Sequence, residues 1–271
     1  MYQAQGVIKG REGDSFMAQD ATFGGDDLFR FACHKDLACF KRCCRDVNIF
    51  LTPFDVLRMR RKLAMSSTAF LDQYTTVLVP EETGLPVVML KMGEGGEKTC
   101  QFLEESGCRI YAERPWSCRM APVDIAGEGE YRFIFEPSRC LGLDAEQEWT
   151  MGDWVRDQGL DVYDRVEAPF RDFTSRLKFP AGKVPGPQVA QMFYMGCYDL
   201  DRFRKFVLES RFLDVFDLPA GLVEQVRTDD MALLHLGIAW LDFGLADINA
   251  MRVKESYQKE MAEKMPDKPL Q

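Results

Sequence analysis

The chain has 271 residues and only two histidines, His34 and His235. This scarcity leaves few options for histidine-based acid–base catalysis. No run approaches the roughly 18 uninterrupted apolar residues that a bilayer span requires. The first twenty residues are polar and broken by glycines, and they lack the apolar centre of a signal peptide. We therefore expect a soluble, cytoplasmic protein that does not enter a membrane.

Positive charge is also in short supply. The chain carries 34 Lys and Arg against 43 Asp and Glu, a formal net charge of −9. A general binder of nucleic acid or of anionic membranes would draw its affinity from clustered Lys and Arg. We therefore expect no nucleic-acid partner and no membrane partner. Hydrophobic residues make up 46% of the chain, enough to bury a core in one large domain or two modest ones.

Cysteine is abundant by contrast, and eight of the nine cysteines lie between residues 33 and 140. In a reducing cytosol, clustered cysteines more often bind metal or do redox chemistry than form disulfides. Thiolate is the soft ligand that zinc and iron–sulfur clusters select. Disulfides and inert buried thiols are the alternatives, although the adjacent Cys43 and Cys44 would bridge each other only with strain. The predicted metal ligands are Cys33, Cys39, Cys43, Cys44, Cys100, Cys108, Cys118 and Cys140.

Eight thiols suffice for two four-thiolate sites, or for one site with spare cysteines. Basic residues flank both cysteine groups in this otherwise acidic chain, where nearby cations would lower thiol pKa values and offset the charge of a site. For any single basic residue, an ordinary solvated surface charge is the alternative. The flanking residues are Lys41, Arg42, Arg45, Arg109, Arg114, Arg119 and Arg139.

The cysteines stand in a recognisable series of motifs. These are Cys39-x3-Cys43-Cys44, L-T-P-F-D-V at 51–56, C-Q-F-L at 100–103, G-C-R-I-Y at 107–111 and R-P-W-S-C-R at 114–119. In this order and spacing, residues 31–123 resemble the YkgJ family of cysteine-cluster proteins, described as zinc- or iron-chelating. That family typically begins C-x-x-C-x-x-C-C, whereas here the start is stretched to Cys33-x5-Cys39-x3-Cys43-Cys44. The resemblance implies metal binding through these cysteines.

Three functions are compatible with this pattern. The first is a metal-binding protein whose zinc or iron–sulfur site is structural, or serves metal handling or the maturation of a partner. The second is an iron–sulfur redox or electron-transfer protein. The third is a protein-modifying enzyme, because flagellin lysine N-methylases share a loosely similar cysteine-rich signature. No Gly-rich nucleotide loop supports the third, and we identify no catalytic residues, so enzymatic activity stays open.

Helix-start signals follow the first cysteine group. Thr52 is a suitable N-cap, Pro53 suits the first helical position, and Asp55 follows three residues after the cap. Ser66 and Ser67 predict the start of a second short helix. Short β-rich runs predict strands at 86–92, 99–102, 108–111 and 131–135, with glycines in the turns between them. We expect a small antiparallel sheet that carries the second cysteine group on its loops.

Beyond residue 144, apolar residues recur at spacings of three and four and predict helices. The expected helical ranges are 145–155, 162–179, 189–210, 219–226, 230–243 and 247–261. We interpret Cys197 as a buried thiol, His235 as a core or interface histidine, and His34 as an exposed spectator rather than a ligand.

The sequence therefore predicts an α+β fold: a small cysteine-rich part with short helices and a small antiparallel sheet, followed by an all-α C-terminal half. The expected segments are an arm at 1–30, a metal-binding domain at 31–143 and a helical region at 144–271. Residues 180–187 are interpreted as an internal linker and 265–271 as a frayed tail. The helical region would be a scaffold, or a docking surface for a possible protein partner.

Overall fold

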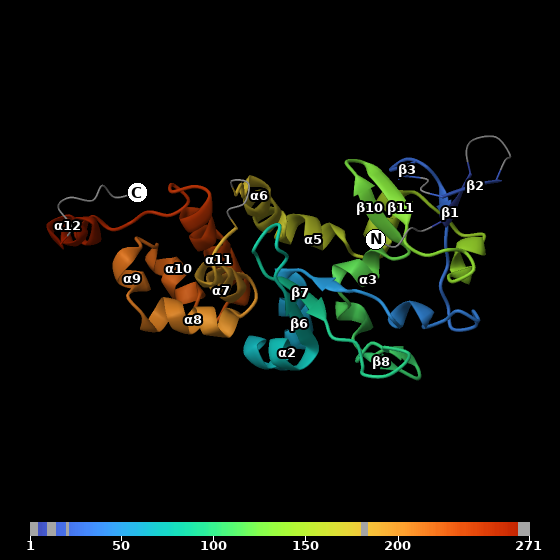
Figure 1. Ribbon diagram of the computed structural model, residues 1–271, viewed down its shortest axis with the longest axis horizontal. Coiled ribbons are helices and arrows are strands. Elements are labelled where there is room, and N and C mark those ends of the chain that lie inside the picture. Colours follow the sequence, from blue (N-terminus) through green and yellow to red (C-terminus); the bar gives the residue numbers. More distant parts are fainter. Residues whose placement is uncertain (1–4, 10–14, 20–21, 180–183, 265–271) are drawn as a thin grey trace. The chain divides into compact units, whose positions relative to one another are not determined.

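The computed structural model describes residues 5–9, 15–19, 22–179 and 184–264. It confirms the predicted α+β class, with short strands in the first half of the chain and helices dominating the second (Figure 1). Contacts divide the chain into two compact units. We call residues 1–55 and 89–166 the cysteine unit, and residues 56–88 and 167–271 the helical unit. The boundaries of these compact units differ from those of the predicted segments 1–30, 31–143 and 144–271. The predicted segments stay a prediction.

The chain passes from one unit to the other within α1 (Pro53–Lys62) and returns within β7 (Val87–Leu90). The start of α1 is the one predicted. The Asp55 N–H donates to Thr52 Oγ1 at 3.1 Å, and the Thr52 N–H donates back to Asp55 Oδ2 at 3.0 Å. This reciprocal pair satisfies two backbone donors at the helix terminus. Ser66 likewise caps α2 (Ser67–Tyr74), accepting from the Ala69 N–H at 3.1 Å.

Strands of the cysteine unit form several small antiparallel sheets instead of one. Pairs are formed by β1 (Gln5–Lys9) with β2 (Ser15–Gln19), β12 (Glu148–Trp149) with β4 (Phe29–Arg30), and β8 (Leu103–Glu104) with β9 (Gly107–Cys108). A three-stranded sheet has the order β10 (Val123–Gly127), β11 (Glu130–Phe133) and β3 (Phe23–Gly24). The second cysteine group therefore does not lie on the loops of one sheet. The strands are short, and two of them, β12 and β11, pair with strands about a hundred residues earlier in the chain.

Aromatic side chains form the core of the cysteine unit. Phe23 and Phe29 are buried, with Phe23 5.2 Å from the ring of Phe133 and Phe29 6.0 Å from that of Trp154. Two short strands of the predicted N-terminal arm thus supply core residues. Residues 1–4, 10–14, 20 and 21 of that arm lie outside the described residues.

Several predicted C-terminal helices are shorter or divided, whereas the helix predicted at 230–243 extends to Leu245 and the one predicted at 247–261 spans Glu255–Lys264. The range 145–155 begins with β12 and becomes helical only at α4 (Met151–Asp157), while 162–179 divides into α5 (Asp161–Val166) and α6 (Ala168–Arg176). Asp199 divides 189–210 into α7 (Pro187–Cys197) and α8 (Leu200–Glu209), because its side chain caps α8. The last helices are α9 (Phe212–Val215), α10 (Ala220–Gln225), α11 (Asp230–Leu245) and α12 (Glu255–Lys264). The helical unit also contains the strand β6 (Thr75–Leu78). Parts of the predicted linker (180–183) and the whole tail (265–271) fall outside the described residues.

The helical unit is packed around α11, which contacts α7 and α8. A Cβ on Gly237 would lie 2.2 Å from the Gly196 carbonyl oxygen, so α7 and α11 approach more closely there than any larger residue permits. Phe203 stacks on Trp240 with ring centroids 5.5 Å apart. Cys197 is fully buried at this crossing, as predicted.

A polar network ties the start of this unit to its centre. The Asp230 carboxylate pairs with Arg60 at 2.5 Å, with Arg61 at 2.9 Å and with Arg204. The Ser67 hydroxyl donates to Asp199 at 2.8 Å, joining α2 to α8. Among the helices of the described residues, none has both the length and the apolar character needed to cross a membrane.

Candidate metal centre

The first cysteine group is brought to the second by the backbone. Lys41 has a positive φ of 72° and turns the chain into the 3₁₀ helix η1 (Arg42–Cys44). The Cys44 carbonyl oxygen then accepts the Cys100 N–H at 2.8 Å, and Arg45 pairs with Thr99 in an antiparallel bridge. Cys43 and Cys44 therefore lie beside the segment that carries Cys100.

Cys100 and Cys108 are held by the β8–β9 hairpin. The Leu103 N–H donates to the Cys100 carbonyl at 3.0 Å, and Leu103 is the strand partner of Cys108. Phe102 at the base of this hairpin is only 1% exposed, so burial of its ring anchors the turn. The two cysteines are consequently fixed on either side of one tight hairpin.

Cys118 is placed by a short helix, α3 (Trp116–Met120), whose start depends on Asp55. The Asp55 carboxylate accepts the Trp116 N–H at 2.9 Å and the Tyr163 hydroxyl at 2.7 Å, in addition to the Thr52 N–H. Asp55 is 0% exposed, and burial raises its pKa. The sequence identified Asp55 only as a cap of α1. Its two further hydrogen-bond partners, Trp116 and Tyr163, are distant in the sequence, and no local sequence pattern predicts these contacts.

Cys33 and Cys140 are brought near Cys39 by a second set of backbone contacts. The Leu141 N–H donates to Cys39 Sγ at 3.3 Å, and the Ala32 N–H donates to the Gly142 carbonyl at 3.0 Å. A Cβ on Gly142 would lie 2.5 Å from the Ala32 carbonyl oxygen, so this approach requires glycine. The segment just before Cys33 thus runs beside the segment just after Cys140.

The thiols influence one another's pKa values, and we describe them as two sets that share the influence of Cys43. Burial raises the pKa of Cys118, and neighbouring thiolates at Cys100 and Cys108 raise it further. The pKa of Cys44 is raised by its hydrogen bond with Cys43, by burial, and by nearby thiolates that include Cys118 and Cys100. All four members are half-buried, and we call them the covered set. The covered set is Cys44, Cys100, Cys108 and Cys118.

The remaining thiols form what we call the open set, because Cys33 and Cys43 are exposed. Burial raises the pKa of Cys140 to about 11, with further contributions from Cys39, Cys43 and Cys33. The pKa of Cys33 is raised by burial and then by Cys43 and Cys39. The open set is Cys33, Cys39, Cys43 and Cys140.

Cys43 links the two sets. A hydrogen bond from the Cys44 thiol, together with the Arg139 guanidinium, lowers the pKa of Cys43 to about 7. A charge on Cys43 also raises the pKa values of Cys100 and Cys108. The adjacent pair of cysteines therefore contributes one thiol to each set.

The flanking basic residues act in different ways. Burial raises the pKa of Cys108, and the nearby cations Arg114 and Arg109 offset part of that rise. Arg119 is buried and donates instead to the carbonyls of Arg114 at 3.0 Å, Gln158 at 2.6 Å and Ala112. Its position supports the local backbone.

The chemistry of these side chains suits a bound metal, but their present spacing does not. Soft thiols gathered in one region, each disfavouring the ionisation of others, suit zinc or an iron–sulfur cluster, since a metal cation removes that repulsion. Within the described ranges, however, no group of three or more Cys, His, Asp or Glu side chains is close enough to hold a metal ion. The thiols are neighbours without meeting at one coordination point. His34 is exposed, 3.7 Å from Asp36, and Cys197 lies in the helical unit.

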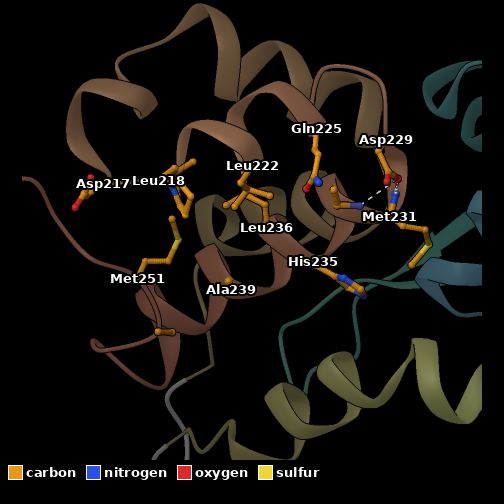
Figure 2. Close-up of a pocket in the computed structure, with 13 residues that line it drawn as sticks. Asp217, Leu218, Leu222, Gln225, Asp229, Met231, His235, Leu236, Ala239 and Met251 are labelled. Carbon is orange, nitrogen blue, oxygen red and sulfur yellow. Dashed lines mark hydrogen bonds between the residues drawn. The ribbon is translucent and has the colours of Figure 1, made fainter.

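A surface groove lies in the helical unit between α10 and α11 (Figure 2). This groove has a volume of about 550 Å³. His235 is exposed on its wall, so the core interpretation of this histidine is wrong, while a role at an interface stays a prediction. The groove is lined by Asp217, Leu218, Pro219, Leu222, Gln225, Asp229, Met231, Ala232, His235, Leu236, Ala239, Ala250 and Met251.

The structure thus gathers eight free thiols from distant segments into one small α+β unit. Residues 32–147 match the family model CxxCxxCC, "Putative zinc- or iron-chelating domain". The match confirms the cysteine-cluster resemblance seen in the motifs, and it includes all eight predicted ligands. No curated protein and no solved structure matches the chain.

Proposed function

We propose that the cysteine unit binds zinc or an iron–sulfur cluster through the thiolates of the covered and open sets. One contrast carries this proposal. Seven of the eight thiols have pKa values that other cysteines change, whereas burial alone raises the pKa of Cys197. Cysteines that influence one another in this way share a region of the protein. A buried structural thiol such as Cys197 does not.

Metal binding would remove the electrostatic repulsion between neighbouring thiolates in this region. In the metal-free protein, ionising one thiol makes ionisation of its neighbours harder, and half-burial adds to that cost. A bound cation stabilises the thiolates together, and its binding free energy becomes folding free energy of the unit. The sulfur atoms must move toward one another for this to occur. Zinc would supply a closed structural centre, and a cluster of iron and sulfide would supply an electron carrier.

The chain's own residues prepare this convergence. Asp55 fixes the start of α3 and therefore the position of Cys118. The hairpin fixes Cys100 and Cys108, and the Cys44–Cys100 backbone bond joins the two cysteine groups. Few residues remain to be ordered when metal binds, which reduces the entropic cost. We propose that the centre is structural, or serves metal handling or the maturation of a partner.

Anaerobic purification followed by an absorbance spectrum and elemental analysis tests this function. A brown protein with several irons per chain would support a cluster, and a colourless protein with stoichiometric zinc would support a zinc centre. The comparison should include protein expressed with added zinc and with added iron. Protein that holds neither metal under both conditions, with its thiols still reduced, would overturn the proposal.

We also propose that the protein works in the cytoplasm. All nine cysteines are within the described residues and are free thiols. Neighbouring free thiols of this kind persist in a reducing compartment and oxidise outside it. Fractionation with a fluorescent fusion at the C-terminus would test this location, and recovery in an oxidising compartment would contradict it.

A protein partner is the last part of the proposal, and the groove of Figure 2 supports it. Leu222 and Leu236 line its centre, and Asp217 and Asp229 lie near its two ends. This arrangement suits an apolar helix with basic ends. Leu222→Glu should abolish the binding of a partner that copurifies with the wild type, whereas Ile248→Glu, at an exposed position outside the groove, should not. Equal binding by both variants would exclude the groove.

A further inference from the structure

One outer strand of the helical unit exposes a run of apolar side chains. The strand β6 runs beside β7 (Figure 1), and no other strand in the described part of the chain pairs with its outer side. Val77 and Leu78 of β6 are 39% and 48% exposed, and the next residue, Val79, is 53% exposed. Outer strands are usually protected by charged side chains, by proline or by a covering element, so an exposed apolar run on such a strand indicates a contact surface.

We propose that β6 is a docking edge for a partner protein, which adds an extended segment to it as an antiparallel strand. The segment has apolar side chains at its centre and basic residues at the end that lies beside Glu81 and Glu82. The groove between α10 and α11 takes no part, since no residue from 75 to 82 lines it. This surface is therefore separate from the proposed metal binding and from the partner proposed for the groove.

Both ends of β6 are held in place. At its start, the Thr75 hydroxyl and the Thr75 N–H donate to the Leu71 carbonyl of α2, the hydroxyl at 2.7 Å. Beyond its end, the Gly84 N–H donates to the Pro80 carbonyl at 2.8 Å. Gly84 has a φ of 62°, and a Cβ there would lie 3.0 Å from the Val184 side chain, so this turn packs closely on a neighbouring segment. A strand that is already extended and anchored needs little ordering when a partner strand pairs with it.

The edge can supply both affinity and selectivity. Alternate residues of an outer strand direct their N–H and C=O groups outward, where an extended peptide satisfies them with main-chain hydrogen bonds. These bonds are largely independent of the partner's side chains. Selectivity would come from Val77, Leu78 and Val79, because successive side chains point to opposite faces and the partner strand meets apolar groups on both.

Charge beyond the end of β6 favours basic residues in the partner. Glu81 and Glu82 are exposed in the turn that follows the strand, and neither forms an ion pair within the described residues. Basic residues that precede the apolar run of an antiparallel partner would lie beside them. A second copy of this chain fits poorly, because its α2 would bring the exposed Asp72 toward this acidic turn.

Fluorescence anisotropy with the full-length chain tests this docking. The probe, which we call the lysine peptide, is a labelled synthetic peptide of two lysines followed by alternating valine and threonine, and it should bind saturably. Leu78→Lys places a charge on the edge and should weaken binding about tenfold or more. Ile125→Lys, at an exposed apolar position of the outer strand β10, is the matched control and should not change binding. No binding by the wild type, or equal losses in the two variants, would overturn the inference.

Charge reversal tests the chemistry of the partner. Glu81→Lys combined with Glu82→Lys should weaken binding of the lysine peptide about tenfold. A peptide in which two glutamates replace the lysines should show the opposite preference and bind the doubly substituted chain better than the wild type. Affinities that respond to neither change would overturn the assignment of a basic partner segment.

Hydrogen–deuterium exchange of the wild type covers the case in which Leu78→Lys fails to fold. The amides of residues 75–79 should exchange more slowly when the lysine peptide is bound, because main-chain pairing protects them. Binding of the peptide without protection of this segment would overturn the inference. Sedimentation of the free chain as a dimer through β6 would overturn it as well, because the occupant would then be a second copy.

Discussion

Asp55 is the residue whose replacement should disturb the cysteine unit most sharply. Its carboxylate accepts the Thr52 N–H at 3.0 Å, the Trp116 N–H at 2.9 Å and the Tyr163 hydroxyl at 2.7 Å, at a position with 0% exposure. Asp55→Ala leaves three donors without this acceptor. An unsatisfied buried donor costs about 1–3 kcal/mol. Removing the buried carboxylate recovers part of that cost, so we expect a net loss of about 3–5 kcal/mol.

Tyr163→Phe is the matched control, since it removes one of the three donors and keeps the ring. It should cost about 1–2 kcal/mol. The assay is urea denaturation of the reduced, metal-free protein, followed by tryptophan fluorescence; three of the four tryptophans, Trp116, Trp149 and Trp154, lie in the cysteine unit. A loss below about 1 kcal/mol for Asp55→Ala, or equal losses in the two variants, would refute the assignment of Asp55 as the shared anchor of α1 and α3.

The titration of Asp55 adds a pH dependence with a definite sign. Burial raises its pKa in the folded protein above the value in the unfolded chain, which is about 3.9. The folded state therefore binds this proton more tightly. The component of stability that is linked to this proton is fully present below the unfolded pKa and is lost as pH rises through the folded pKa. Asp55→Asn should remove this component, so the difference in unfolding free energy between wild type and Asp55→Asn should change across that window. A constant difference would contradict the raised pKa.

Three further predictions concern the thiols and the helical unit. Cys44→Ser and Cys118→Ser should lower the metal content and the stability of the cysteine unit, whereas Cys197→Ser should leave the metal content unchanged; equal metal loss in all three would contradict the partition. Burial and neighbouring thiolates raise the pKa values of Cys44 and Cys118, so metal binding must release protons, and the affinity measured by chelator competition should rise steadily from pH 6 to pH 8. Gly237→Ala should destabilise the protein by about 2 kcal/mol or more because its Cβ meets the backbone of α7, while Gly244→Ala, which meets nothing within 4 Å, should be neutral or stabilising by up to about 1 kcal/mol. Thermal denaturation of both glycine variants measures this contrast.

Local chemistry made part of the fold predictable. The caps of α1 and α2 were readable because Thr52, Asp55 and Ser66 satisfy backbone donors within three residues of themselves. The resemblance to a zinc- or iron-chelating family could be predicted from motifs for a similar reason, since cysteine spacing is a local property of the sequence. The burial of Cys197 followed from its apolar helical surroundings.

Contacts between residues distant in the sequence could not be predicted. The hydrogen bond from Trp116 to Asp55 spans 61 residues, and that from Tyr163 spans 108, and neither leaves a trace in local spacing. The periodicity of residues 189–210 continues across Asp199, although its side chain caps a new helix there. His235 lies in an apolar helix, yet it faces a groove whose other wall comes from residues before α11. Which thiols share a set likewise depends on contacts such as Leu141 with Cys39.

X-ray absorption at the metal edge of anaerobically purified protein is the most direct test of the central claim. We predict a first coordination shell made of sulfur alone, about 2.3 Å from the metal if it is zinc. This shell should be lost or mixed with oxygen when Cys118 is replaced by serine, and it should be unchanged in Cys197→Ser. A wild-type shell dominated by nitrogen or oxygen would contradict the account, because the clustered thiols would then not be the ligands.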